Sequence, residues 1–211
     1  MSAVFFSHPD KLPSVKLEKG DTVGYYDPSR VLIVISPDAA NDPSLVLREF
    51  MHSVLDKQQD AGRLSEDRRQ ALLPFESLMA FCIPASFLNN PKIGNSSMKG
   101  EPKDYIYDLQ GPSDLRDYDK PEQYEKPYGG AEMLRRVFWD IRQAVGRDTA
   151  DKFVVGAWQE FSRSSSTQSA KEFLTIFERQ FEQGAGSKQL LELNEYTRRT
   201  ICSCRLNMDG S

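Results

Sequence analysis

The sequence predicts an α+β protein that is mainly helical, with a small N-terminal sheet and a helical C-terminal half. Two stretches near the N-terminus, residues 21–26 and 31–36, are rich in β-branched and aromatic side chains, as strands are. From residue 129 onward, apolar side chains recur with helical spacing. A chain of 211 residues can bury a sizeable core without disulfides, so we expect a single domain over residues 1–211.

The N-terminal part, residues 1–40, is expected to form the strands. The turn-forming residues 27–30 separate the two apolar stretches, which predicts a β-hairpin. The next part, residues 41–128, should begin with a helix, because Asn41 and Asp42 offer an N-cap and Pro43 suits a first helical turn. This helix is expected to end near Gly62, which can supply a left-handed cap.

Later elements are separated by proline, glycine and polar segments. Pro74 is expected to interrupt the chain and open a new helix over residues 75–83, with Glu76 nearly alone among apolar neighbours. Residues 89–128 form a long loop by composition, and such loops are usually functional or mobile. The helical C-terminal part, residues 129–211, contains four periodic segments: residues 131–145, 149–161, 170–181 and 188–202.

Composition narrows the class of partner. The chain has 27 Lys and Arg against 31 Asp and Glu, a net charge of −4, and no long basic run, so nucleic-acid binding has little support. The longest apolar runs are too short to span a bilayer. The first ten residues lack the pattern of a signal peptide, so we expect a cytoplasmic protein, or an exported one if the chain is a fragment.

Three cysteines, Cys82, Cys202 and Cys204, cannot all pair within one chain, and reduced thiols are expected. We also find no G-x-S-x-G motif and no phosphate-binding loop.

The first predicted helix carries the most informative motif. Arg48, Glu49, His52 and Asp56 lie among apolar residues in the pattern R-E-F-M-H, one residue from H-E-x-x-H. In that motif two histidines four residues apart hold a zinc ion, and the glutamate acts as general base for a metal-bound water. Arg48 replaces the first histidine here, and a guanidinium has no lone pair for a metal.

With these residues in view, the chain resembles the thermolysin-like, gluzincin group of zinc metallopeptidases between about Tyr25 and Trp158. The resemblance implies a zincin-like fold, with a strand hairpin before the motif helix. It also implies that Glu49 stands at the general base, that His52 and Glu76 stand at zinc ligands, and that Asp56 is the aspartate after the second histidine. Tyr128 and the glycine pair after it are similar to the start of the helix that closes the family's site.

The departures concern the metal centre. Arg48 stands at the first ligand, and Ala80 stands where the family has the aspartate that orients that histidine. A ligand and its supporting residue are thus missing together, which indicates that metal binding was abandoned. The residues just before the glycine pair contain no histidine for the oxyanion, and the chain has only His8 and His52.

We therefore expect a degenerate, non-catalytic relative with no cofactor. Glu49 is an idle ancestral base, His52 and Glu76 are vestigial ligands, and Tyr128 is a weak candidate for contacting a ligand. Arg48 is expected to replace the charge of the metal by pairing with Glu76 or Glu49.

The expected role is to bind a peptide or protein in the former cleft, or to serve as a structural domain. One alternative is an active zinc metalloendopeptidase that uses His52, Glu76 and a third ligand such as Asp56. Another alternative is an unrelated helical interaction domain whose motif match is accidental.

Overall fold

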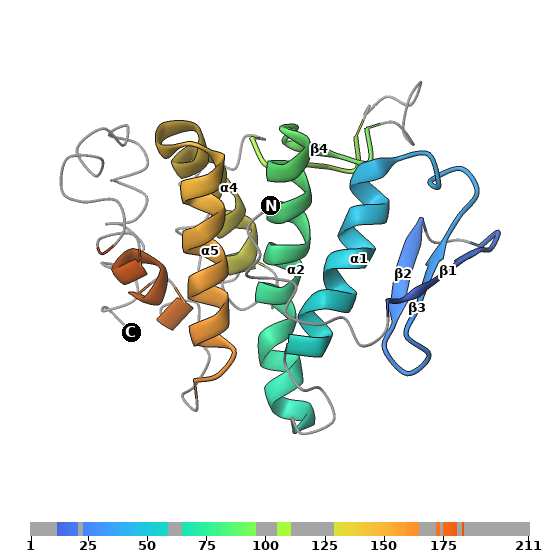
Figure 1. The fold of residues 1–211 in the computed structure, drawn as a ribbon, viewed down its shortest axis with the longest axis horizontal. Coiled ribbons are helices and arrows are strands. Elements are labelled where there is room, and N and C mark those ends of the chain that lie inside the picture. The colour runs from blue at the N-terminus through green and yellow to red at the C-terminus, as the bar shows by residue number, and fades with distance from the viewer. Residues whose placement is uncertain are drawn as a thin grey trace. The chain divides into compact units, whose positions relative to one another are not determined.

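A computed structural model describes residues 12–20, 23–58, 65–95, 105–110, 129–164, 172–173, 175–180 and 183. The chain divides into two compact units. Unit 1 comprises Met1–Arg63 and Ala80–Leu109, and unit 2 comprises Leu64–Met79 and Gln110–Ser211. The described residues form long helices and two small sheets, which confirms the predicted α+β, mainly helical class (Figure 1).

Unit 1 contains a three-stranded sheet in the order β1-β3-β2. Strands β2 (Gly24–Asp27) and β3 (Leu32–Ile35) are antiparallel, which confirms the predicted hairpin. Strand β1 (Ser14–Leu17) pairs in parallel with β3 and was not predicted, because four residues with a single alternation carry little signal. All four residues of the central strand β3 are buried.

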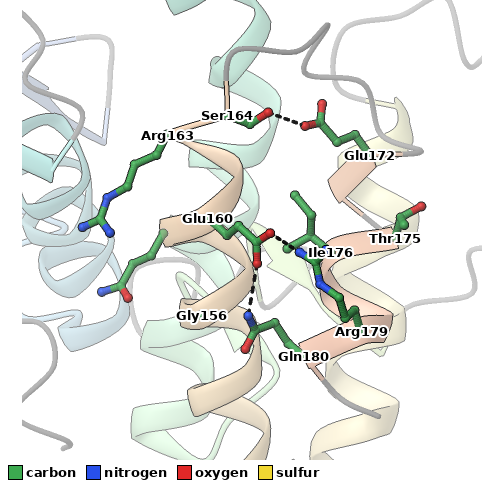
Figure 2. Close-up of a pocket in the computed structure, with 10 residues that line it drawn as sticks. Gly156, Glu160, Arg163, Ser164, Glu172, Thr175, Ile176, Arg179 and Gln180 are labelled. Atoms are coloured by element: carbon green, nitrogen blue, oxygen red, sulfur yellow. Dashed lines mark hydrogen bonds and ion pairs between the residues drawn. The ribbon is translucent and has the colours of Figure 1, made fainter. Parts of the chain in front are cut away.

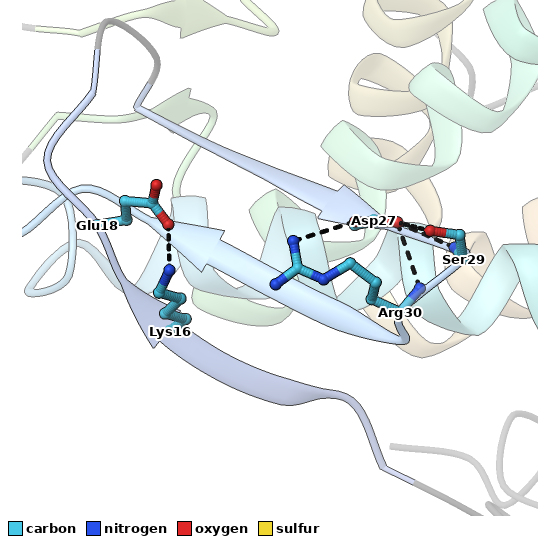
Figure 3. Close-up of polar contacts among 5 residues, drawn as sticks. All are labelled: Lys16, Glu18, Asp27, Ser29 and Arg30. Atoms are coloured by element: carbon cyan, nitrogen blue, oxygen red, sulfur yellow. Dashed lines mark hydrogen bonds and ion pairs between the residues drawn. The ribbon is translucent and has the colours of Figure 1, made fainter.

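The hairpin turn is closed by Asp27 (Figure 3). Its Oδ1 accepts hydrogen bonds from the N–H groups of Ser29 and Arg30 at 3.0 and 3.3 Å, and from the Ser29 hydroxyl at 2.6 Å. The Ser29 hydroxyl is the main reason that the pKa of Asp27 lies below its ordinary value. A carboxylate that satisfies backbone donors in this way fixes the turn and the hairpin register.

Helix α1 (Pro43–Gln58) begins where the sequence predicts and contacts β2 and β3. Asp42 caps it: its Oδ1 accepts a hydrogen bond from the Ser44 N–H at 3.0 Å, and its carbonyl accepts one from Val46 at 3.2 Å. The predicted end near Gly62 lies outside the described residues.

Helix α2 (Glu66–Leu88) corrects the prediction that Pro74 opens a new helix. A proline inside a helix removes a hydrogen bond and costs about 3 kcal/mol or more. Apolar side chains on both sides of Pro74, among them Leu72, Phe75 and Leu78, are at most 5% exposed. Each such burial contributes roughly 1.5–3 kcal/mol, so a continuous apolar surface outweighs the missing bond.

The predicted loop contains a short two-stranded sheet that the sequence did not indicate. Strands β4 (Lys92–Ile93) and β5 (Tyr107–Asp108) are antiparallel and belong to unit 1. Asn89 ends α2 with a φ of 54°, a left-handed conformation that asparagine tolerates. Residues 111–128, including Tyr128, lie outside the described part of the chain.

In unit 2, α4 (Gly129–Val145) and α5 (Arg147–Phe161) agree with two of the predicted helices. They contact each other and are joined by Gly146, whose φ of 86° is one that glycine adopts at little cost. Of the two later predicted helices, residues 172–173 and 175–180 are helical, and residues 188–202 are not described. No helix of the described residues is long and apolar enough to cross a membrane.

Aromatic side chains fill the core of unit 2. Trp139 and Trp158 are 1% and 0% exposed. The Phe75 ring lies 4.6 Å from Phe161 and 5.2 Å from Phe173, measured between centroids. This cluster joins the N-terminal part of α2 to α5 within one unit.

Candidate functional site on helix α1

The start of α1 is held by buried polar groups. Asp42 and Ser44 are 1% and 2% exposed, and the Ser44 hydroxyl donates a hydrogen bond to Asp42 Oδ1. The same hydroxyl accepts a hydrogen bond from the Gly94 N–H at 2.8 Å. This chain of contacts ties the helix N-terminus to the turn after β4, and the backbone donors that a helix start leaves open are thereby partly satisfied.

One turn further on, Glu49 is almost completely buried at 2% exposure. An isolated buried carboxylate is costly, so it needs a cation or donors. Arg48 supplies them: its Nη1 forms an ion pair with Glu49 Oε1. Arg48 was expected to pair with Glu76 or Glu49, and the structure brings together Arg48 and Glu49.

Gly24 on strand β2 lies where a side chain would press against β3. A Cβ added at Gly24 lies 2.7 Å from Ile35 Cδ1, 3.1 Å from the Val34 carbonyl and 3.5 Å from Glu49 Cγ. Real Cβ atoms do not approach other atoms at the first of these distances. Gly24 therefore permits the close packing of β2 against β3 beside the Glu49 side chain.

One aromatic ring, that of Phe81, packs against Arg48. The guanidinium carbon lies 4.9 Å from the centroid of Phe81, and the Phe81 ring lies 4.8 Å from that of Tyr107. A guanidinium over an aromatic face is attracted by the ring quadrupole. Arg48 Nε is buried without a hydrogen-bond partner, so the side chain is held by its charge and by the ring.

Asp56 and His52 complete a row on the helix. Arg48, His52 and Asp56 are spaced by four residues and therefore share one face of α1. Asp56 Oδ2 accepts a hydrogen bond of 3.2 Å from the Tyr26 hydroxyl on β2, and His52 is half-buried. The row thus presents a guanidinium, an imidazole and a carboxylate along α1.

Two predicted site residues belong to other parts of the chain than unit 1. Glu76 is half-buried on the N-terminal part of α2, which belongs to unit 2, whereas Arg48, Glu49 and His52 belong to unit 1. The expected approach of Glu76 to His52 and Arg48 therefore stays a prediction. Tyr128 lies outside the described residues, and its role also stays a prediction.

The described donor set does not fit the zinc centre of an H-E-x-x-H helix. Arg48 stands at the first ligand position with its charge directed to Glu49. In the described part of the chain, no three His, Cys, Asp or Glu side chains form a group that could hold a metal ion. A structural or catalytic zinc site takes at least three protein ligands. We therefore derive no hydrolytic step through a metal.

Several residues of the site escaped sequence analysis. Tyr26 and Phe81 contact α1 from segments far away in the sequence, and Tyr107 packs against Phe81. No local pattern indicates such contacts. Gly24 carried a usable signal, because a glycine inside a strand pattern marks close approach of another chain segment.

Unit 2 contains a separate open groove of about 1020 Å³ between the end of α5 and residues 172–180 (Figure 2). Figure 2 shows Glu160 turned toward Arg179, with which it forms an ion pair, and toward Gln180, whose amide donates to it at 3.2 Å. Glu172 accepts a hydrogen bond of 2.6 Å from Ser164. Both carboxylates that line the groove therefore hold its walls together.

Comparison of the chain with protein-family models, with curated proteins and with solved structures gives no match.

Proposed function

We propose that the chain is a zincin-related protein without peptidase activity, which binds a peptide or protein segment along α1. The observation that carries this proposal is the ion pair between Arg48 and Glu49. It lies at the two positions where the resemblance places a zinc ligand and the general base. A peptidase needs both positions for a metal-bound water, and the ion pair occupies both.

Charge and burial both oppose the action of Glu49 as a general base. A general base must reach the water from which it takes a proton. Glu49 is 3% exposed at its side chain and directed to a guanidinium, so a water must displace that cation to reach it. Arg48 also places a fixed positive charge at the metal position, which repels a dication.

The order of elements supports the ancestry. The β2–β3 hairpin is followed directly by α1 and then by α2, as the resemblance implies. The binding role is supported by the row of Arg48, His52 and Asp56, which is partly exposed on α1. These side chains can donate hydrogen bonds to, and accept hydrogen bonds from, the amide groups of an extended peptide.

The proposal is tested first by metal analysis of protein purified without chelator, together with hydrolysis of casein and short peptides. We expect no stoichiometric zinc and no cleavage. Arg48→His should create weak zinc affinity, weak because Ala80 cannot orient the new imidazole. One zinc per chain, lost together with hydrolysis in His52→Ala, contradicts the proposal.

Binding is tested with a photo-crosslinking amino acid at position 52 and a pool of biotinylated random peptides. We expect crosslinking of a restricted set of peptides, reduced by Arg48→Ala. The matched control places the crosslinker at Lys57, which is exposed in the last turn of the same helix. Equal, unselective labelling from both positions rules out a peptide site on α1.

A further inference from the structure

Strand β1 is the exposed edge of the sheet in unit 1 (Figure 3). Among the described strands it pairs with β3 alone, and all four of its residues are exposed. Val15 and Leu17 are 60% and 59% exposed. The opposite edge differs, because β2 contacts α1 and three of its four residues are half-buried.

The backbone of β1 offers a second set of hydrogen bonds. The N–H groups of Ser14 and Glu18 donate to the carbonyls of Val31 and Ile35, each at 3.1 Å. Backbone groups alternate in direction along a strand, so those of Val15 and Leu17 point to the open side. An edge of this kind is a template for another strand.

The side chains of β1 divide between two faces. Val15 and Leu17 lie opposite Ile33 and Ile35 in the register and share their face, whereas Lys16 and Glu18 point to the other. Lys16 Nζ lies 2.6 Å from Glu18 Oε2, and both side chains are about half exposed (Figure 3). An exposed ion pair of this kind contributes little to stability, so Lys16 and Glu18 can each form an ion pair with another partner instead.

We infer that β1 pairs antiparallel with β1 of a second copy of this chain, around a two-fold axis through Leu17. A strand that fits this edge needs an acid opposite Lys16, an apolar residue opposite Leu17 and a base opposite Glu18. Read in the antiparallel direction, Lys16-Leu17-Glu18 is that sequence. Two three-stranded sheets then join into one.

Charge selects this register among those that the backbone allows. With Leu17 opposite Leu17, the outward backbone groups bond to each other, and each Lys16 faces Glu18 of the other copy. A shift of two residues in one direction places Lys16 opposite Lys16, and in the other direction Glu18 opposite Glu18. Like charges directly opposite each other destabilise a strand pair.

The association is expected to be weak. Pairing of such short strands buries less than the roughly 1,200 Å² of a stable interface, so a dissociation constant above about 10 μM is expected. This inference does not depend on peptide binding by α1.

Charge reversal tests the inference by sedimentation equilibrium over roughly 10 μM to 1 mM, the range in which interfaces of this size associate. Lys16→Glu and Glu18→Lys should each weaken dimerisation about fivefold to thirtyfold, because two attractive cross-strand pairs become repulsive. The double variant should restore it, and mixing the two single variants should give a heterodimer. Lys57→Glu, which changes the net charge equally on exposed α1 surface, should have no effect.

A crosslink tests the register directly. With Cys202 and Cys204 replaced by serine, Leu17→Cys should form a disulfide-linked dimer on mild oxidation, because directly paired Cα atoms about 5.5 Å apart permit the bond. Val15→Cys, on the same face and equally exposed, should not, since it lies opposite Lys19. A monomeric wild type over the whole range overturns the inference. So does a double variant as weak as the single variants, or equal crosslinking at both positions.

Discussion

Helices α1 and α5 are of similar length but are stabilised in different ways. The buried side chains of α5 are all apolar, and they include Phe153, Trp158 and Phe161. Helix α1 buries Ser44, Glu49 and Ser53 in addition to apolar side chains. Burying polar groups costs free energy unless each is paired, whereas burying apolar surface stabilises directly. Packing alone therefore accounts for the buried positions of α5, whereas the buried positions of α1 also require polar partners.

The largest expected effect is on α5. Trp158→Ala should lower the free energy of unfolding by about 3–5 kcal/mol, because it removes a side chain that is 0% exposed and leaves a cavity. Trp158→Phe should cost clearly less, since the Nε1 donor that it removes has no partner. Chemical denaturation measures both. A Trp158→Ala protein of wild-type stability means that the aromatic core does not hold α5.

The corresponding change on α1 is Arg48→Ala. It should destabilise the fold by roughly 1–4 kcal/mol, since it leaves the buried Glu49 carboxylate without its cation. In a double-mutant cycle, the added effect of Glu49→Gln should then be smaller than in the wild type. Unchanged stability of Arg48→Ala, or strict additivity in the cycle, shows that the ion pair carries no energy.

The packing of β2 beside α1 gives a smaller effect. Gly24→Ala should cost about 1–3 kcal/mol, because the Ile35 side chain can move away from the new Cβ but the Val34 carbonyl is fixed in the sheet. Gly20→Ala is the matched control, since nothing lies within 4 Å of its added Cβ. Thermal denaturation compares the two, and equal effects exclude close approach as the reason for Gly24.

The smallest effect concerns Asp140 on α4. Desolvation is the main cause that raises the pKa of Asp140, and Arg136, whose Nε donates to both carboxylate oxygens at 3.1 Å, opposes the rise. A raised pKa in the folded state gives stability that is present below the ordinary value near 3.9 and lost as the pH rises through the folded value.

Asp140→Asn should therefore flatten the loss of stability that begins as the pH rises through the ordinary value near 3.9. Arg136→Ala should steepen it, because the opposing charge is removed. Urea denaturation at several pH values measures the slopes. A steeper slope in Asp140→Asn than in the wild type contradicts the stated cause.

Short-range sequence signals predicted those features that contacts between neighbouring residues stabilise. The N-cap at Asp42 and the hairpin turn at Asp27 each act through neighbouring backbone groups, and each lies where the sequence indicates. The prediction at Pro74 was wrong because burial of apolar side chains on both sides outweighed a local rule. Strand β1 was missed because parallel pairing with β3 depends on contacts far apart in the chain.

The sequence indicated which residues of the candidate site share one helix, but it did not indicate which other residues contact them. Arg48, Glu49, His52 and Asp56 were recognised by their spacing on one helix. Tyr26 on β2 and Phe81 on α2 contact them, and Tyr107 on β5 packs against Phe81. A single sequence does not encode those distances.

The central position of β3 has a consequence for misfolding. Its four residues, Leu32–Ile35, are apolar, uncharged and free of proline and glycine, which is the composition of aggregation-prone strands. The hairpin partner β2 is close in sequence, whereas β1 must close a longer loop to reach β3, so we expect β1 to dock later during folding. Until it docks, one edge of β3 is open to other chains. Docking of β1 covers that edge, so the strand that then faces other chains carries Lys16 and is followed by Glu18, in place of four apolar residues.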